Sequence, residues 1–202
     1  MKIKICGFTN AQNANQAAML GIDAIGLVFY DQSLRNVGVE TALQIVNALP
    51  PFINRVGLFV NADSSFIDEV LCEVPLDTLQ FHGDESAAEC RQYAMPFIKA
   101  LRVNQDTNII KMADEYHQSS GLLLDAFNKD TYGGTGESFD WSLAKVDIDL
   151  PIILAGGLNP NTVADAVSQV NPYAVDVSSG VESELGIKDI DKIRKFIQRV
   201  NA

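Results

Sequence analysis

The sequence predicts an α/β protein, a (β/α)8 barrel of the TIM type that forms a single domain over residues 1–202. Three observations favour this fold. Short apolar, β-branched segments alternate with helical patterns, the alternation repeats eight times, and no linker or low-complexity stretch divides the chain. Strands that are apolar on both faces and separated by helices belong to a parallel sheet that those helices cover.

Eight segments have the composition of buried parallel strands, because they are short, apolar and rich in β-branched residues. In chain order they are residues 3–6, 24–29, 55–60, 78–81, 97–101, 122–125, 152–155 and 174–177. A helical candidate follows each of them, and the segment 140–149 has room for only a short helix.

Three of the helices have clear boundary signals. The helix after the first strand begins at a Thr-Asn cap at 9–10 and ends at Gly21. The helix after the second strand extends from residue 39 to the proline pair at 50–51, and the last helix spans 189–200.

Eight uninterrupted units favour a closed barrel over an open sheet. The chain has 202 residues, and the usual size of this fold is about 250 residues, so we expect tight connections. The alternative is a doubly wound sheet, and the absence of a dinucleotide-binding fingerprint counts against it.

The composition limits the partners of the protein. A formal net charge of −11 disfavours nucleic acid and anionic membrane surfaces. No apolar run approaches the roughly 20 residues of a membrane span, and the N-terminus leads directly into a strand without the apolar region of a signal peptide. The chain is expected to be either a monomer or a homodimer.

The cysteines indicate the compartment. Cys6, Cys72 and Cys90 are an odd number, lie far apart and form no CxxC pair. This pattern argues against a disulfide framework or a zinc site and predicts a cytoplasmic protein. Cys72 and Cys90 lie within helical patterns and are expected to serve packing.

Two loops have the composition of a phosphate site. Gly156 and Gly157 follow the seventh strand, and Ser178, Ser179 and Gly180 follow the eighth. Glycine lets the backbone approach an anion closely, and serine hydroxyls add donors. The loops after strands seven and eight commonly bind phosphate in this fold. Either loop alone would be an ordinary turn, but together they predict a phosphorylated small-molecule ligand.

Cys6 and Asp125 are a candidate base and acid. Each ends a strand, and the C-terminal ends of barrel strands converge on one mouth. A thiolate at Cys6 could act as a general base or nucleophile, although a buried cysteine more often serves packing. A carboxylate that ends the apolar strand of Asp125 must be hydrogen-bonded structurally or face a ligand.

Arg35 and His82 are candidate ligand contacts at the same mouth. Arg35 lies in the polar loop 31–38 after the second strand, where its guanidinium could hold a substrate carboxylate or be merely solvated. His82 ends the fourth strand and is either a ligand contact or a structural histidine. No further histidine or carboxylate lies at metal-ligand spacing around it, so no metal is predicted. The glycine-rich loop 126–138 is either a flap over the mouth or an ordinary loop.

Nine segments across the chain resemble one known family. They are residues 4–9 (KICGFT), 33–37 (SLRNV), 56–61 (VGLFVN), 79–83 (LQFHG), 123–125 (LLD), 132–136 (YGGTG), 139–141 (FDW), 155–159 (AGGLN) and 176–182 (DVSSGVE). In composition and order they resemble the phosphoribosylanthranilate isomerases. Phe8 and Ala155 depart from the residues most expected at their positions, and neither supplies a catalytic group.

The resemblance implies an Amadori rearrangement in tryptophan biosynthesis, without cofactor or metal. N-(5-phosphoribosyl)anthranilate would become 1-(2-carboxyphenylamino)-1-deoxyribulose 5-phosphate. Asp125 would protonate the furanose ring oxygen as general acid, and Cys6 would remove the C2 proton as general base. Arg35 would hold the anthranilate carboxylate, the two glycine-containing loops would hold the phosphate, and His82 and Asp176 would contact the sugar.

Three alternatives remain at this point. An indole-glycerol-phosphate synthase would need an inward lysine and glutamates at strand ends, but the second strand has no lysine and Lys99 lies within the fifth. A histidine-pathway sugar isomerase would have aspartate in place of Cys6. A non-catalytic phosphate-binding barrel would keep both loops but gives no reason for the pair Cys6 and Asp125.

Overall fold

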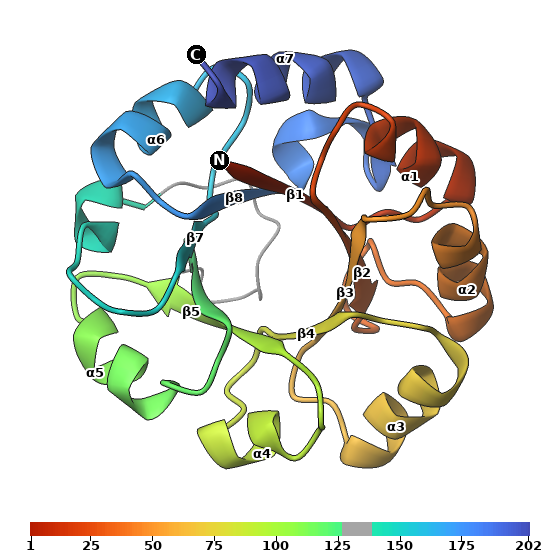
Figure 1. Ribbon diagram of the computed structural model, residues 1–202, viewed down its shortest axis with the longest axis horizontal. Coiled ribbons are helices and arrows are strands. Elements are labelled where there is room, and N and C mark those ends of the chain that lie inside the picture. The colour runs from red at the N-terminus through yellow and green to blue at the C-terminus, as the bar shows by residue number, and fades with distance from the viewer. Residues whose placement is uncertain (127–138) are drawn as a thin grey trace.

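The computed structural model describes residues 1–126 and 139–202, and these residues form a closed barrel of parallel strands (Figure 1). The barrel strands are β1 (Lys2–Cys6), β2 (Ala24–Phe29), β3 (Asn54–Phe59), β4 (Thr78–Phe81), β5 (Phe97–Val103), β6 (Gly121–Ala126), β7 (Ile152–Leu154) and β8 (Ala174–Val177). Each pairs with the next in the sequence, and β8 pairs with β1. The predicted (β/α)8 fold is confirmed.

The helices form a ring outside the strands (Figure 1). They are α1 (Ala11–Ala18), α2 (Val39–Asn47), α3 (Ser64–Glu73), α4 (Ala87–Arg91), α5 (Ile109–Glu115), α6 (Val163–Val170) and α7 (Ile190–Val200). The predicted cap of the first helix is confirmed, because the Asn10 side chain accepts from the Asn13 N–H. The last helix begins one residue later than predicted, at Ile190, and the Asp189 side chain caps it by accepting from the N–H groups of Asp191 and Lys192. None of the helices in the described ranges is long and apolar enough to cross a membrane.

Two connections depart from a regular strand–helix repeat. Between β6 and β7 the described residues contain only a short 3₁₀ turn, η1 (Trp141–Ala144), where the sequence left room for a short helix. After β8 the chain forms a second 3₁₀ turn, η2 (Ser179–Val181), and an antiparallel pair of short strands, β9 (Glu182–Glu184) and β10 (Ile187–Lys188), before α7 begins. The sequence analysis did not predict this hairpin.

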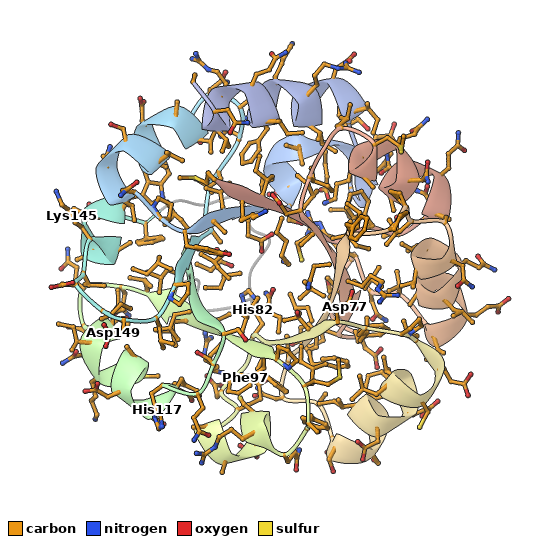
Figure 2. The ribbon with its side chains drawn as sticks, viewed as in Figure 1. Asp77, His82, Phe97, His117, Lys145 and Asp149 are labelled. Atoms are coloured by element: carbon orange, nitrogen blue, oxygen red, sulfur yellow. The ribbon has the colours of Figure 1, made fainter. Side chains whose placement is uncertain are left out.

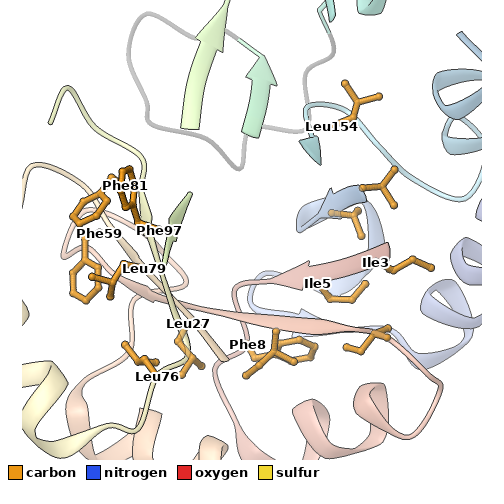
Figure 3. Packing of buried hydrophobic residues seen from close by; sticks show 14 of the residues in the cluster. Ile3, Ile5, Phe8, Leu27, Phe59, Leu76, Leu79, Phe81, Phe97 and Leu154 are labelled. Atoms are coloured by element: carbon orange, nitrogen blue, oxygen red, sulfur yellow. The ribbon is translucent and has the colours of Figure 1, made fainter. Parts of the chain in front are cut away.

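The alternation of side chains along each strand separates the core from the site. On β1, Ile3 and Ile5 belong to the large apolar cluster between strands and helices, whereas Cys6 belongs to a separate cluster with Val28 and Leu58. Aromatic residues of β3, β4 and β5 pack together in the outer layer, as Figure 3 shows for Phe59, Phe81 and Phe97. The alternate residues of each strand therefore face the barrel interior.

The same alternation places polar side chains inside β4. Leu79 and Phe81 are buried in the outer layer, and Gln80 and His82 alternate with them. Figure 2 shows His82 near the barrel axis, whereas His117 and Lys145 lie on the outer side of the ring. Polar residues that face inward at the strand ends are thus available to a ligand.

We predict that Leu79→Ala lowers the free energy of unfolding by about 2–5 kcal/mol, because it leaves a cavity in a close-packed layer. Leu79 is fully buried, at 0% exposure, whereas Leu34 is 74% exposed, so Leu34→Ala serves as a matched control with an expected change within about 0.5 kcal/mol. Urea unfolding followed by circular dichroism measures both. Equal effects of the two substitutions would contradict the assigned packing.

Candidate active site

A pocket opens at the C-terminal ends of the strands. Its lining includes every site residue predicted from the sequence except Gly180, namely Cys6, Arg35, His82, Asp125, Gly156, Gly157, Asp176, Ser178 and Ser179. The lining also includes three apolar side chains that pack in one cluster: Val28 of β2, Leu58 of β3 and Val60, which follows β3. The structure thus brings together residues that are up to 173 positions apart in the sequence, from Cys6 to Ser179.

Cys6 ends β1 inside the pocket and is buried, with 6% exposure. The Cys6 side chain fits only because residue 26 is glycine. A Cβ at Gly26 would lie 2.6 Å from the Cys6 Sγ. Burial raises the pKa of the Cys6 thiol above its ordinary value, while the charges of Lys4 and Lys188 oppose that rise. The cysteine is therefore mainly protonated at neutral pH.

A buried ion pair lies beside the cysteine. Lys4, two residues before Cys6 on the same face of β1, places its Nζ 2.8 Å from the Asp176 Oδ2. Burial raises the pKa of the Asp176 carboxyl, and the ammonium of Lys4 opposes this shift. The other oxygen, Asp176 Oδ1, is buried and has no hydrogen-bond partner within the described residues. That oxygen can accept a hydrogen bond from a ligand.

Asp125 and His82 are neighbours in the lining of the same pocket. The His82 Nε2 lies 3.3 Å from the Asp125 Oδ2, and the Asp125 Oδ1 accepts a hydrogen bond of 2.8 Å from the Ala126 N–H. The Gln80 Nε2 lies 2.9 Å from the His82 Nδ1 and donates to it, so the ring proton of a neutral His82 resides on Nε2. The imidazole N–H is thereby directed towards the carboxylate.

The loop after β7 has the backbone geometry expected of an anion site. Gly156 and Gly157 have φ of +77° and +66°, in the left-handed region that favours glycine. A Cβ at Gly156 would lie 2.8 Å from the Ala126 N, so no larger residue fits there. Within the described ranges, the N–H groups of Gly156, Gly157 and Leu158 donate to no backbone carbonyl, which leaves them available to an anion.

The loop after β8 lies directly against the loop after β7. A Cβ at Gly180 would lie 1.9 Å from the Leu158 carbonyl oxygen, which shows how closely the two backbones approach. The Ser178 hydroxyl, which the sequence predicts as a phosphate donor, donates to the Cys6 carbonyl oxygen over 2.9 Å in this structure. The N–H groups of Ser179 and Gly180, at the start of η2, donate to no backbone carbonyl in the part of the chain described.

Arg35 reaches the pocket but is already paired. Its Nε and Nη2 donate to the two carboxylate oxygens of Glu182, over 2.7 and 2.8 Å, in a bidentate pair. A Cβ at Gly7, where φ is +81°, would lie 2.5 Å from the Arg35 Cδ, so this glycine makes room for the arginine. Arg35 is the predicted partner of a ligand carboxylate. Because one N–H of Nε and one of Nη2 already bind Glu182, only the other guanidinium N–H groups can meet such a ligand.

The sequence analysis missed four polar residues at or beside the site: Lys4, Gln80, Glu182 and Lys188. Lys4 and Gln80 interrupt strands that are otherwise apolar, and this was the signal that could have identified them.

The packing prediction holds for Cys90, which is buried in α4, and is wrong for Cys72, which is exposed. All three cysteines are free thiols. The predicted flap, residues 126–138, lies outside the described residues apart from Ala126.

The described residues offer no group of three histidine, cysteine, aspartate or glutamate side chains that could hold a metal ion. The polar groups at the pocket instead suit an organic anion: N–H groups on two loops, one guanidinium, and the carboxylates of Asp125 and Asp176 that can contact hydroxyl groups.

Comparison with known proteins gives a consistent result along the whole chain. The family model described as N-(5'phosphoribosyl)anthranilate (PRA) isomerase matches residues 3–199. The N-(5'-phosphoribosyl)anthranilate isomerase of Pseudomonas fluorescens (strain Pf0-1) is 54% identical over 99% of this chain and 98% of the relative. That of Pseudomonas aeruginosa (strain LESB58) is 51% identical over 100% of this chain and 96% of the relative.

Solved structures agree with the sequence relatives. The phosphoribosyl anthranilate isomerase from Thermotoga maritima is 39% identical, has a TM-score of 0.91, and is matched over 100% of this chain and 98% of that chain. A phosphoribosyl anthranilate isomerase in complex with reduced 1-(o-carboxyphenylamino)-1-deoxyribulose 5-phosphate is 38% identical, with a TM-score of 0.86 and the same coverage.

We predict that alkylation of Cys6 by iodoacetamide has its pH midpoint above that of a small free thiol, about 8.5. The sign follows from the raised pKa: the unreactive thiol persists at neutral pH, and the thiolate forms only as the pH rises through the higher value. Mass spectrometry of the Cys6 peptide against pH measures the midpoint, with Cys6→Ser as the control for assignment. A midpoint below about pH 8 would contradict the dominance of burial.

Proposed function

The chain belongs to the N-(5'-phosphoribosyl)anthranilate isomerase family, and we propose that Asp125 and Cys6 carry out the Amadori rearrangement of N-(5-phosphoribosyl)anthranilate in tryptophan biosynthesis. The chain is an isomerase by this membership. The observation that carries the residue assignment is that Asp125 and Cys6 line one pocket together with residues of the loops after β7 and β8. The substrate has a matching set of groups: a phosphate, a ring oxygen to be protonated, and a C2 proton to be removed.

Ring opening is the task of Asp125. Its protonated carboxyl donates a proton to the furanose oxygen, the bond from C1 to that oxygen breaks, and the anilino nitrogen lone pair forms a C1=N bond. The His82 Nε2, 3.3 Å from the Asp125 Oδ2, stabilises the carboxylate that remains. The products of this step are a protonated Schiff base and a free hydroxyl group at the former ring position.

Proton removal from carbon is the task of Cys6. Its thiolate takes the C2 proton, the electron pair forms a C1=C2 bond, and the nitrogen becomes neutral, which gives an enolamine. Protonation at C1 and loss of the C2 hydroxyl proton then yield the ketone. A buried thiolate with a raised pKa is scarce at neutral pH but is a stronger base towards carbon, and the nearby ammonium groups of Lys4 and Lys188 favour its formation.

Binding is assigned to the remaining groups. The two loops after β7 and β8 hold the phosphate through the N–H groups of Gly156, Gly157, Ser179 and Gly180, while Arg35 holds the anthranilate carboxylate. The buried oxygen of Asp176 and the ring of His82 face the ribosyl hydroxyls. The relative solved with reduced 1-(o-carboxyphenylamino)-1-deoxyribulose 5-phosphate supports a phosphorylated ligand of this size. The cytoplasm is the proposed compartment.

Two observations on the described residues count against the competing enzyme classes. Lys99, the candidate lysine for an indole-glycerol-phosphate synthase, is buried away from the pocket lining and pairs with Glu85 over 2.8 Å and with the Gly83 carbonyl over 2.8 Å. The position of Cys6, where a histidine-pathway isomerase would have aspartate, is occupied by a thiol.

We predict that Asp125→Asn and Cys6→Ala each lower kcat by about 10²–10⁴-fold, the usual contribution of one acid–base group. Because neither group is assigned to phosphate or carboxylate binding, the Kd for the reduced product analogue should change by less than about threefold. The loss of phosphoribosylanthranilate fluorescence measures turnover, and isothermal titration measures binding. Full turnover in either variant would remove that residue from the mechanism, and loss of binding together with turnover would reassign it to the binding of substrate.

A further inference from the structure

Glu182 lies between two buried cations at the edge of the pocket. Its carboxylate accepts from the Arg35 Nε and Nη2 over 2.7 and 2.8 Å and from the Lys188 Nζ over 2.7 Å. All three side chains are buried, with side-chain exposures of 10% for Arg35, 7% for Glu182 and 0% for Lys188. Burial disfavours the charged carboxylate, but the hydrogen bonds from Arg35 and Lys188 hold the pKa of Glu182 below its ordinary value.

We propose that Glu182, on β9, is the positioning residue that sets recognition of the substrate's aryl carboxylate, because it fixes the guanidinium of Arg35 at one edge of the pocket. This inference rests on the proposed function, in which Arg35 holds that carboxylate. Glu182 itself does not touch the substrate, since it is absent from the pocket lining and acts through Arg35.

The first argument is the geometry of the guanidinium. Arginine has five N–H groups in one plane, and two of them face Glu182. Within the described residues no acceptor binds the Arg35 Nη1, so the edge formed by Nη1 and the second N–H of Nη2 is available to a second carboxylate. Arg35 lines the pocket, and we infer that a planar carboxylate bound there meets this edge.

The second argument is the charge of the cluster. Two cations share one carboxylate, which leaves one formal positive charge in a chain whose net charge is −11. The substrate carries a carboxylate and a phosphate, so local positive charge is needed at this mouth. Without Glu182, Arg35 and Lys188 would repel each other, and the guanidinium would lose both of its fixed partners.

The third argument is the position of Lys188 on the hairpin. Its Nζ also lies 3.2 Å from the Ser178 carbonyl oxygen and 6.0 Å from the centre of the Phe8 ring. Lys188 therefore remains tied to the β8 loop and the core when Glu182 is changed. A substitution at Glu182 should thus act mainly on Arg35, not on the phosphate loops.

The test compares Glu182→Gln with Glu184→Gln. Both residues lie on β9 and both substitutions remove one carboxylate, but Glu184 is exposed. We expect Glu182→Gln to raise KM about 10- to 100-fold, the effect of losing a charge-assisted hydrogen bond, with kcat changed less than about threefold. Glu184→Gln should leave both constants unchanged, and Glu182→Asp should restore part of the loss.

Equilibrium binding separates positioning from general damage. Two reduced product analogues are titrated, one with the anthranilate carboxylate and one with plain aniline in its place. Glu182→Gln should weaken binding of the first by the same 10- to 100-fold and leave binding of the second unchanged. Equal weakening of both would overturn the inference, because a distorted pocket would lose both ligands. If Glu182→Gln does not fold, Glu182→Asp in the same two titrations decides the question.

Arg35→Ala distinguishes a failure of this inference from a failure of the proposed function. An unchanged KM in Arg35→Ala would remove Arg35 from carboxylate binding and the proposed role with it. A raised KM in Arg35→Ala together with an unchanged KM in Glu182→Gln would overturn only the role of Glu182. The double variant should match Arg35→Ala, since Glu182 acts through Arg35, and additive effects would contradict this.

Discussion

The pairing of β1 with β8 is the constraint on which the site depends. It closes the sheet, with Lys4 opposite Asp176 and Ile5 opposite Val177, and the hydroxyl of Ser178 bonds to the Cys6 carbonyl beyond the last pair. A shift of this register by one residue would turn each inward side chain of one strand towards the helices. Cys6, which is the proposed base, the neighbouring Lys4–Asp176 ion pair and part of the proposed phosphate site are therefore all positioned by the pairing of β1 with β8.

The buried charged side chains at the mouth of the barrel form ion pairs. In each pair described below, one side chain keeps polar atoms that its partner does not contact. Lys4 takes one oxygen of Asp176, and Glu182 takes one edge of the Arg35 guanidinium. Breaking one partner of such a pair leaves an uncompensated buried charge, which is strongly destabilising. The pairs consequently hold Asp176 and Arg35 in single orientations, so each presents its free atoms to a ligand at little further cost in conformational entropy.

Most of the barrel could be predicted because strands buried on both faces are recognisable as local apolar segments. Cys6 and Asp125 could be placed at the mouth because each ends such a strand. The hairpin β9–β10 could not, since strands of two and three residues have no readable period. Nor could the partners of Arg35 and Lys4, which lie 147 and 172 residues away and meet them only after the barrel closes. Sequence locates a functional residue at a strand end more readily than the partner that orients it.

Buried polar atoms of the pocket that have no hydrogen-bond partner among the described residues connect the stability of the fold with ligand binding. The Gln80 Oε1 and Asp176 Oδ1 are buried without a hydrogen-bond partner among the described residues, and both residues line the pocket. An unpaired buried polar atom costs about 1–3 kcal/mol, so the fold retains them at the expense of stability. The hydroxyl groups of a bound ribosyl phosphate would supply partners for these atoms. Part of the affinity for the substrate then arises because binding supplies hydrogen bonds to atoms that folding has already removed from water, a contribution that a pocket without unpaired polar atoms would lack.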